Sequence, residues 1–157
     1  MTTERTLIII KPDAVNRTLV GEIIKRFEQK GLKIAAMKLE YLKTEKLQEH
    51  YAHHKDKPFF PELVNFMSSI PSVLVVFEGS QAVKVGRKMA GATHGVEADI
   101  GTIRGDYSLS NQNNIIHASE SVEAATDEIL RFFNKDEIHE YDRMDFESLY
   151  SLGERKK

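Results

Sequence analysis

The sequence predicts an α/β (α+β) sandwich, in which helices cover a four-stranded antiparallel sheet. Short β-branched runs alternate with amphipathic segments along the chain, an order typical of a sheet packed against helices. Hydrophobic residues make up 41% and charged residues 29%, which is ordinary globular composition. A chain of 157 residues can bury one core without disulfides. We therefore expect a single domain over residues 1–157, of which residues 134–157 form a C-terminal extension.

The expected strands are apolar runs too short for helices and bounded by turn residues. They cover residues 5–11, 32–42, 72–77 and 115–117, with Gly79 turning the chain after the third. The expected helices have apolar residues at i, i+3, i+4 and i+7 spacing or are rich in helix formers. The first begins near Val20 and stops at Gly31, and an inserted helical hairpin lies within residues 44–69. Two further helices cover residues 81–90 and 121–133, with Ser121 as a helix cap. This order matches the ferredoxin-like βαββαβ plan.

Charge and composition exclude several classes of function. The formal net charge of -2 gives no field that would hold a nucleic acid nonspecifically, so no nucleic-acid partner is expected. The chain has no cysteine, which excludes disulfides, thiolate metal ligands and a cysteine nucleophile. Its longest aliphatic runs, 7–10 and 73–77, are too short to cross a bilayer, and no secretory signal precedes them. We expect no membrane partner and a cytoplasmic location.

The candidate chemistry centres on His117, which ends an expected strand just before a strongly periodic helix. Ser119 lies two residues further along and shares a strand face with the histidine. Glu128, beside the apolar stripe of the following helix, can return a carboxylate to the ring. Such a carboxylate fixes the tautomer and leaves the other nitrogen free as a nucleophile. The alternative from local sequence is a structural histidine.

Cationic and hydroxyl side chains accompany this histidine at strand ends and in loops. They are Lys11, Arg87, Thr93 and Arg104. A polyphosphate needs donors of this kind, and these positions are expected to converge near His117. Arg104 lies between Gly101 and Gly105, and we expect flanking glycines to let the backbone approach an anion. Residues 91–113 form a long irregular segment, which is typical of a binding loop.

Several other motifs have competing interpretations. Phe59 and Phe60, between two prolines, are either a hydrophobic plug over the core or a platform for an aromatic ligand such as a base. His50, His53 and His54 have metal-ligand spacing, but a solvated helix face is favoured because no other ligand type lies nearby. Residues 86–93 have P-loop spacing without its lysine, so we reject a P-loop. The basic tip 154–157 is expected to be a solvated tail.

The combined motifs resemble those of the nucleoside diphosphate kinase family, in colinear order from about Arg5 to Phe133. The matching segments are 6–13, 20–23, His50-Tyr51 with 57–60, 101–106 and 114–121. The resemblance implies a ping-pong enzyme in which His117 attacks a nucleoside triphosphate through Nδ1, and another nucleoside diphosphate then takes the phosphoryl group. It also implies that Glu128 holds Nε2 and that Ser119 joins the same network.

The resemblance further assigns the ligands of the nucleotide. It implies that Lys11 contacts the terminal phosphate and ribose, that Tyr51 lies beside the transferred phosphoryl group, and that Asn114 bonds the ribose. Arg87, Thr93 and Arg104 hold phosphates, while Phe59 and Leu63 clamp the base. No metal ligand of the protein itself is implied, because Mg²⁺ arrives bridging the nucleotide phosphates. A base held by stacking predicts broad base tolerance. Assembly into a homo-oligomer, a hexamer or tetramer, is expected.

Two other classes of function are weaker alternatives. A regulator that retains the pocket without turnover does not need both His117 and Glu128. An RNA-recognition domain on the same sheet topology needs exposed aromatic residues in a basic, glycine-rich strand, and the third and fourth expected strands offer only Phe77.

Overall fold

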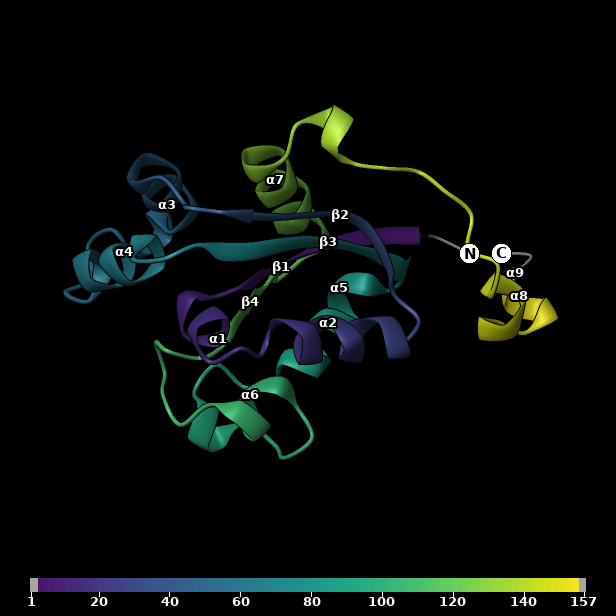
Figure 1. Cartoon of the computed structure of the whole chain (residues 1–157), viewed down its shortest axis with the longest axis horizontal. Helices are drawn as coiled ribbons and strands as arrows, with labels where there is room; N and C mark the ends of the chain where they lie inside the picture. The colour runs from purple at the N-terminus through teal and green to yellow at the C-terminus, as the bar shows by residue number, and fades with distance from the viewer. Residues whose placement is uncertain (1–2, 156–157) are drawn as a thin grey trace.

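The computed structural model of the chain describes residues 3–155. Four strands form one antiparallel sheet in the order β2-β3-β1-β4. The strands are β1 (Thr3–Ile10), β2 (Lys33–Glu40), β3 (Ser72–Ser80) and β4 (Ile116–Ala118). Figure 1 shows α7 (Val122–Phe132) on one face of the sheet, with α2 (Val20–Gln29) and α5 (Ala82–Ala90) on the other. The predicted sandwich and its four-stranded antiparallel sheet are confirmed.

The two faces of the sheet bury two separate apolar clusters. Because side chains alternate along a strand, Leu7 and Ile9 of β1 pack under α7, whereas Ile8 and Ile10 pack against α2 and α5. All four residues are fully buried. This explains why β1 is a continuous apolar run rather than an alternating pattern.

The inserted hairpin consists of α3 (Thr44–His50) and α4 (Phe60–Ser68), with a short 3-10 turn at Ala52–His54 between them. Leu47 of α3 and Met67 of α4 are fully buried in the cluster under α7. The hairpin therefore extends the core on the face of the sheet that also carries α7.

Strand β3 continues past the predicted turn at Gly79. Gly79 pairs with Glu4 of β1, and a Cβ at this position would lie 2.7 Å from Leu32 Cδ2. A side chain here would force Leu32 to shift, so the glycine permits close packing against Leu32, and local sequence gives no sign of this contact. Two short helices, α1 (Pro12–Asn16) and α6 (Ile103–Tyr107), occupy segments without helical periodicity.

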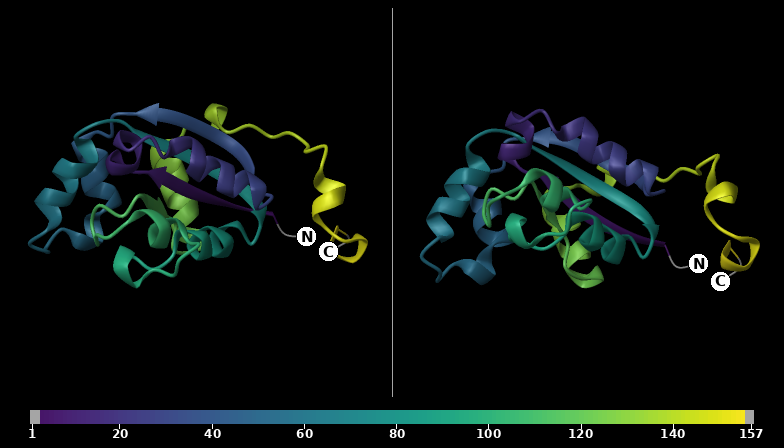
Figure 2. Two further views of the ribbon diagram at one scale, coloured as in Figure 1. Left: turned by 60° about the horizontal axis from the view of Figure 1, so that its bottom comes forward. Right: turned by 90° about the horizontal axis from the view of Figure 1, so that it is seen from below.

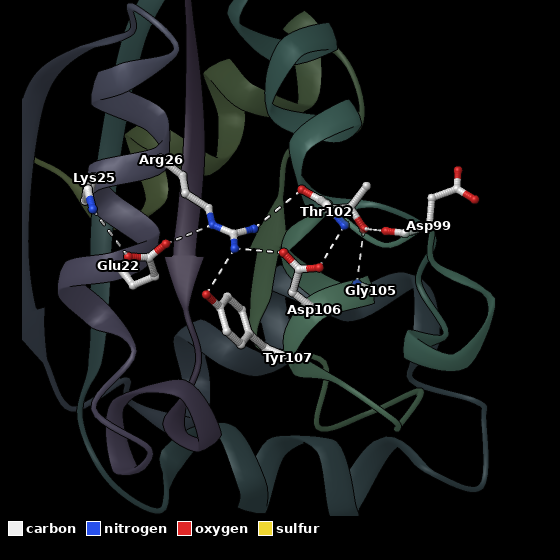
Figure 3. Close-up of polar contacts among 9 residues, drawn as sticks. Glu22, Lys25, Arg26, Asp99, Thr102, Gly105, Asp106 and Tyr107 are labelled. Atoms are coloured by element: carbon white, nitrogen blue, oxygen red, sulfur yellow. Dashed lines mark hydrogen bonds and ion pairs between the residues drawn. The ribbon is translucent and has the colours of Figure 1, made fainter.

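The long loop 91–113 is tied to α2 by Arg26 (Figure 3). The Arg26 Nη2 atom lies 2.7 Å from Asp106 Oδ2 and 3.0 Å from the Tyr107 hydroxyl. Asp106 also accepts a 2.7 Å hydrogen bond from the backbone N–H of Gly101, and Arg26 Nε bonds Glu22. These contacts fix α6, which carries Arg104.

The C-terminal extension folds back along the sheet instead of leaving it. The His139 N–H donates to Ala35 O at 2.8 Å, the Tyr141 hydroxyl to Ile34 O at 2.7 Å, and Arg143 Nη1 to Gly31 O at 3.0 Å. Helices α8 (Phe146–Leu149) and α9 (Leu152–Arg155) then lie at the end of the sheet opposite α3 and α4 (Figure 2).

The predicted solvated tip is wrong for Arg155. Its Nε donates to Tyr150 O at 2.8 Å, because the preceding short helices turn the chain back on itself. Lys156 and Lys157 lie outside the described residues. Within residues 3–155, no helix combines the length and apolar character needed to span a bilayer.

Candidate active site

A cavity of about 570 Å³ opens between β4, the α3–α4 hairpin, α7 and the loop 91–113. Every predicted site residue except Ser119 lines it. These lining residues are Lys11, Tyr51, Phe59, Leu63, Arg87, Thr93, Arg104, Asn114, His117 and Glu128. Side chains far apart in the sequence thus converge on one space, as the sequence predicts.

His117 is held from behind by a carboxylate. It pairs with Ile9 in the sheet, so its ring projects toward α7 on the same face as Ile9. The His117 Nε2 atom lies 2.9 Å from Glu128 Oε1, and Ser119 Oγ donates to Glu128 Oε2 at 2.6 Å. Among the described residues nothing hydrogen-bonds His117 Nδ1, which leaves that nitrogen available for attack.

Helix α7 places this carboxylate. Ser121 caps the helix by accepting a 3.1 Å hydrogen bond from Ala124 N, as predicted. The buried apolar face of α7 then points Glu128 at the sheet. Burial opposes ionisation, but the hydrogen bonds from His117 and Ser119 outweigh it and hold the pKa of the Glu128 carboxyl below its usual range. The carboxylate stays charged and fixes an Nε2–H tautomer.

Lys11 and Asn114 form a buried polar pair at the floor of the cavity. Lys11 Nζ donates to Asn114 Oδ1 at 2.6 Å, and Asn114 Nδ2 donates to Thr93 O at 2.8 Å. Burial, aided by repulsion from Arg104 and opposed by Asp13, lowers the pKa of Lys11 to about 8. The ammonium is therefore charged at neutral pH, and its partners Asn114 Oδ1 and Gln112 O are neutral groups.

Arg104 is held by backbone carbonyls. Its Nε, Nη1 and Nη2 atoms donate to the carbonyl oxygens of Asn114, Gly91 and Ile116 at 3.2, 2.9 and 2.8 Å. Burial and repulsion from Arg87 lower the pKa of Arg104 to about 10, so the guanidinium remains charged. Arg87 lines the same cavity, with Nη1 3.5 Å from Ala118 O.

The predicted role of the glycines beside Arg104 is wrong. A Cβ at Gly105 would lie 2.0 Å from Asp99 O, so this residue is glycine because the loop packs against itself. Gly101 has φ +95, a conformation that other residues rarely adopt. Neither glycine lines the cavity, whereas Arg104 does.

Comparison with known proteins agrees with this arrangement. The family profile "Nucleoside diphosphate kinase" matches residues 4–138. The chain is 51% identical over 151 residues to a nucleoside diphosphate kinase of Parabacteroides distasonis, covering 96% of this chain and 99% of that one. It is 55% identical over 138 residues to one of Staphylothermus marinus, covering 88% and 98%. A solved nucleoside diphosphate kinase of Halobacterium salinarum in complex with CDP superposes with a TM-score of 0.93 at 43% identity, covering 96% of this chain and 100% of that one.

The chain belongs to the nucleoside diphosphate kinase family.

The sequence left two interpretations open for the adjacent phenylalanines, and each residue fits one of them. Phe60 packs against the core cluster under α7, as a plug would. Phe59 is 42% exposed and lines the cavity together with Leu63. One residue closes the core, and the other presents a flat apolar surface to the cavity.

The predicted solvated position of His50 is wrong. His50 shares a helix face with Leu47, three residues earlier, and that face packs into the core. Its ring lies edge-on to His117, with centroids 4.7 Å apart, and also contacts Tyr51 and Phe132. Periodicity with Leu47 was the available signal, but the polar composition of α3 obscured it. His53 is exposed, as expected for a solvated helix face, and His54 is half-buried.

His50 remains neutral in the folded chain. Burial and the proximity of His117 lower the pKa of His50 to about 3, and both ring nitrogens are buried without a hydrogen-bond partner. One ligand atom each of His50, His117 and Glu128 lies within 4.8 Å of the others. His117 Nε2 and Glu128 Oε1 already bond each other, so within this group only the His50 nitrogens are buried and unpaired.

The buried His50 makes stability depend on pH. An unfolded histidine titrates near 6.5, at roughly its reference pKa, so the unfolded state binds the extra proton as pH falls from there toward about 3. We expect His50→Phe to reduce the slope of unfolding free energy against pH in this window by about 1.4 kcal/mol per pH unit. Urea denaturation between these pH values measures both slopes, and parallel slopes would contradict a neutral buried His50.

Proposed function

We propose that the chain transfers the terminal phosphate of a nucleoside triphosphate, mainly ATP, to a nucleoside diphosphate through a phosphohistidine on His117. The observation that carries this proposal is the His117–Glu128 pair at 2.9 Å, facing a cavity with Lys11, Arg87 and Arg104 in its walls. A nucleophile with one free nitrogen beside three cations suits phosphoryl transfer, which depends mainly on positioning and charge neutralisation.

In the first half-reaction, the lone pair of His117 Nδ1 forms a bond to the terminal phosphorus. The bond from that phosphorus to the bridging oxygen breaks, and its electron pair leaves with the nucleoside diphosphate. The ring becomes cationic on phosphorylation, and Glu128, hydrogen-bonded to Nε2–H, stabilises that charge. A second nucleoside diphosphate reverses the steps, so one site serves both substrates in turn.

The remaining predicted residues hold the nucleotide in this proposal. Lys11 and Asn114 bind phosphate and ribose, and Thr93 joins Arg87 and Arg104 at the phosphates. Burial, with repulsion from Glu128, raises the pKa of Tyr51, so its hydroxyl stays protonated. That hydroxyl is buried without a partner, and Tyr51 lines the cavity, which suits a donor to the transferred phosphoryl group. Ser119 acts through Glu128.

Magnesium is part of the substrate in this proposal. The cavity wall is rich in nitrogen donors, which fit phosphate oxygens rather than a bare cation. Of the lining carboxylates, Glu128 is bonded to His117 and Ser119, while Glu120 and Asp127 are exposed. Mg²⁺ held between the nucleotide phosphates supplies charge neutralisation at the transferred group.

We also propose a homo-oligomer, a hexamer or tetramer. Large apolar side chains are exposed in the loop 91–113 and on or beside the edge strand β2. They are Val96, Ile100, Leu109, Met37, Leu39 and Tyr41. Grouped exposed apolar residues on an edge strand and one loop are typical of association surfaces. The cytoplasmic location expected from the sequence stays a prediction.

Labelling with ATP that carries a radioactive terminal phosphate tests the function. We expect label on the protein that resists alkali and is lost in acid, because a phosphoramidate bond forms at histidine. It should be absent from His117→Ala and should move entirely into GTP when GDP is added. Label that persists in His117→Ala, or that GDP does not remove, would contradict the proposal.

Substitution of Phe59 tests recognition of the base by stacking. Phe59→Ala should raise KM for ATP and GTP alike, by roughly tenfold, because stacking on an aromatic ring does not depend on the base. Phe59→Tyr retains the ring and should behave like the unsubstituted chain. Initial rates with each donor measure the effect, and a loss confined to one nucleotide would argue for edge recognition instead.

Light scattering after gel filtration tests the assembly. A hexamer or tetramer is expected for the unsubstituted chain, and Ile100→Asp should dissociate it because the charge falls on a residue that is 92% exposed in the single chain. Leu130→Asp, on the exposed side of α7, is the matched control and should leave the assembly intact. A monomer in the unsubstituted chain would exclude the proposed oligomer.

A further inference from the structure

The backbone between Asn114 and His117 is strained. Ile115 has φ +74, and the Ile116 N–H donates to Asn114 O at 2.8 Å, across only one residue. This is a γ-turn with positive φ, a rare and strained form. Ile115 is also β-branched and fully buried, which makes positive φ a clear outlier. The other non-glycine residues with positive φ in the described chain, Thr18 and Gln81, are exposed beside helix ends.

Hydrogen bonds with the side chains of Asp13 and Arg104 and with the backbone N–H of Lys11 hold this turn. The Ile115 N–H donates to Asp13 Oδ2 at 3.1 Å, and Ile115 O accepts from the Lys11 N–H at 2.9 Å. Arg104 bonds the carbonyl oxygens on either side, those of Asn114 and Ile116. Helix α1, which carries Asp13, and strand β4 are thereby joined at one end of the sheet.

The Asp13 carboxylate uses one oxygen, Oδ2, for the hydrogen bond to Ile115. Its other carboxylate oxygen, Oδ1, is buried without a hydrogen-bond partner. A buried unpaired oxygen is unfavourable, so the carboxylate is retained at a cost. Without Asp13, the buried Ile115 N–H would also lose its partner, and nothing else in the described chain bonds it. The strained conformation persists because several hydrogen bonds from its surroundings hold it in place.

The turn sets the position of Asn114 relative to His117. His117 is fixed independently, because β4 pairs with β1 at Ile9 and Glu128 holds the ring. Asn114 lies on the other side of the turn, and its side chain bonds Lys11 Nζ. Relaxation of Ile115 to an extended φ would redirect the chain at Asn114 while leaving His117 in the sheet.

We propose that Asp13 is a positioning residue, whose carboxylate holds the strained turn at Ile115 and thereby places Asn114 relative to the nucleophile. Asp13 does not line the cavity and touches no substrate in this role. The inference rests on the proposed function, because it assigns Asn114 to the nucleotide and His117 to the phosphoryl group.

Paired substitutions at Asp13 test the proposal. We expect Asp13→Ala to lower kcat/KM for phosphoryl transfer from ATP on the order of 10- to 100-fold, since small misplacements of a bound substrate have effects of this size. Asp13→Asn keeps an acceptor for the Ile115 N–H and should stay within about threefold of the unsubstituted chain. Both are assayed at pH 6.5, where Lys11 remains charged despite losing the nearby carboxylate.

Phosphoramidate separates positioning from a damaged nucleophile. This small donor phosphorylates histidine directly: a bond forms from Nδ1 to phosphorus, the phosphorus–nitrogen bond breaks, and ammonia leaves. Asp13→Ala should react with phosphoramidate at the same rate as the unsubstituted chain, because His117 and Glu128 do not move. Thr18→Gly, which removes a strained residue near the end of the same helix, is the matched control and should leave both reactions unchanged.

The outcomes are distinct. An unchanged kcat/KM in folded Asp13→Ala overturns the proposal, as does an equal loss in Asp13→Ala and Asp13→Asn, which would assign the effect to charge. If Asp13→Ala does not fold, Asp13→Asn decides: kinetics near those of the unsubstituted chain support the hydrogen bond, and a tenfold loss or more overturns it. Absence of phosphoryl transfer in the unsubstituted chain would instead refute the proposed function.

Discussion

The hydrogen bond between His117 Nε2 and Glu128 Oε1 is the contact on which the site depends. It joins β4 to α7, so it forms only when the sheet register and the helix packing are both correct. Pairing with Ile9 aims the histidine at α7, and the buried face of that helix returns the carboxylate. Ser119 then bonds both Glu128 and the backbone N–H of Leu7, which links the pair to the central strand.

Two cations of the cavity wall have no carboxylate partner in the described chain, unlike a third, Arg131, whose Nε lies 2.9 Å from Glu49 Oε1. Arg104 and Lys11 bond neutral carbonyl and amide oxygens, which hold the side chains in place without cancelling their charge. Outside the cavity, Lys33 pairs with Glu78 and Arg26 with Asp106. Burial therefore works against the charged forms of Lys11 and Arg104, as their lowered pKa values show. An arriving phosphate group can therefore pair with Lys11 and Arg104, neither of which hydrogen-bonds a carboxylate within residues 3–155.

The sequence predicted those features that follow from local periodicity. The spacing of α7 placed Glu128 near its apolar stripe, as the structure has it. Strand alternation predicted Ser119 beside His117, and the structure joins the two residues through Glu128. Features set by tertiary contact were missed. Gly79 marks close packing against Leu32 and not a turn, and the burial of His50 depends on which face of α3 meets the core. Nothing in the local sequence indicates the contact of Gly79 with Leu32, and the polar composition of α3 obscures the spacing of His50 from Leu47.

The strain at Ile115 is a further feature that the sequence conceals, because Ile115 falls within the expected strand 115–117, which predicts extended backbone. The conformation depends on residues from three separate segments. Lys11 and Asp13 come from the first crossover, while Arg104 comes from α6, which Arg26 ties to α2. The contacts shown in Figure 3 therefore act on the turn through Arg104. A shift of α6 would move Arg104, and with it the carbonyls of Asn114 and Ile116. The separation of Asn114 and His117 is therefore a property of the assembled fold, and a rigid sheet on one side and an anchored loop on the other maintain it.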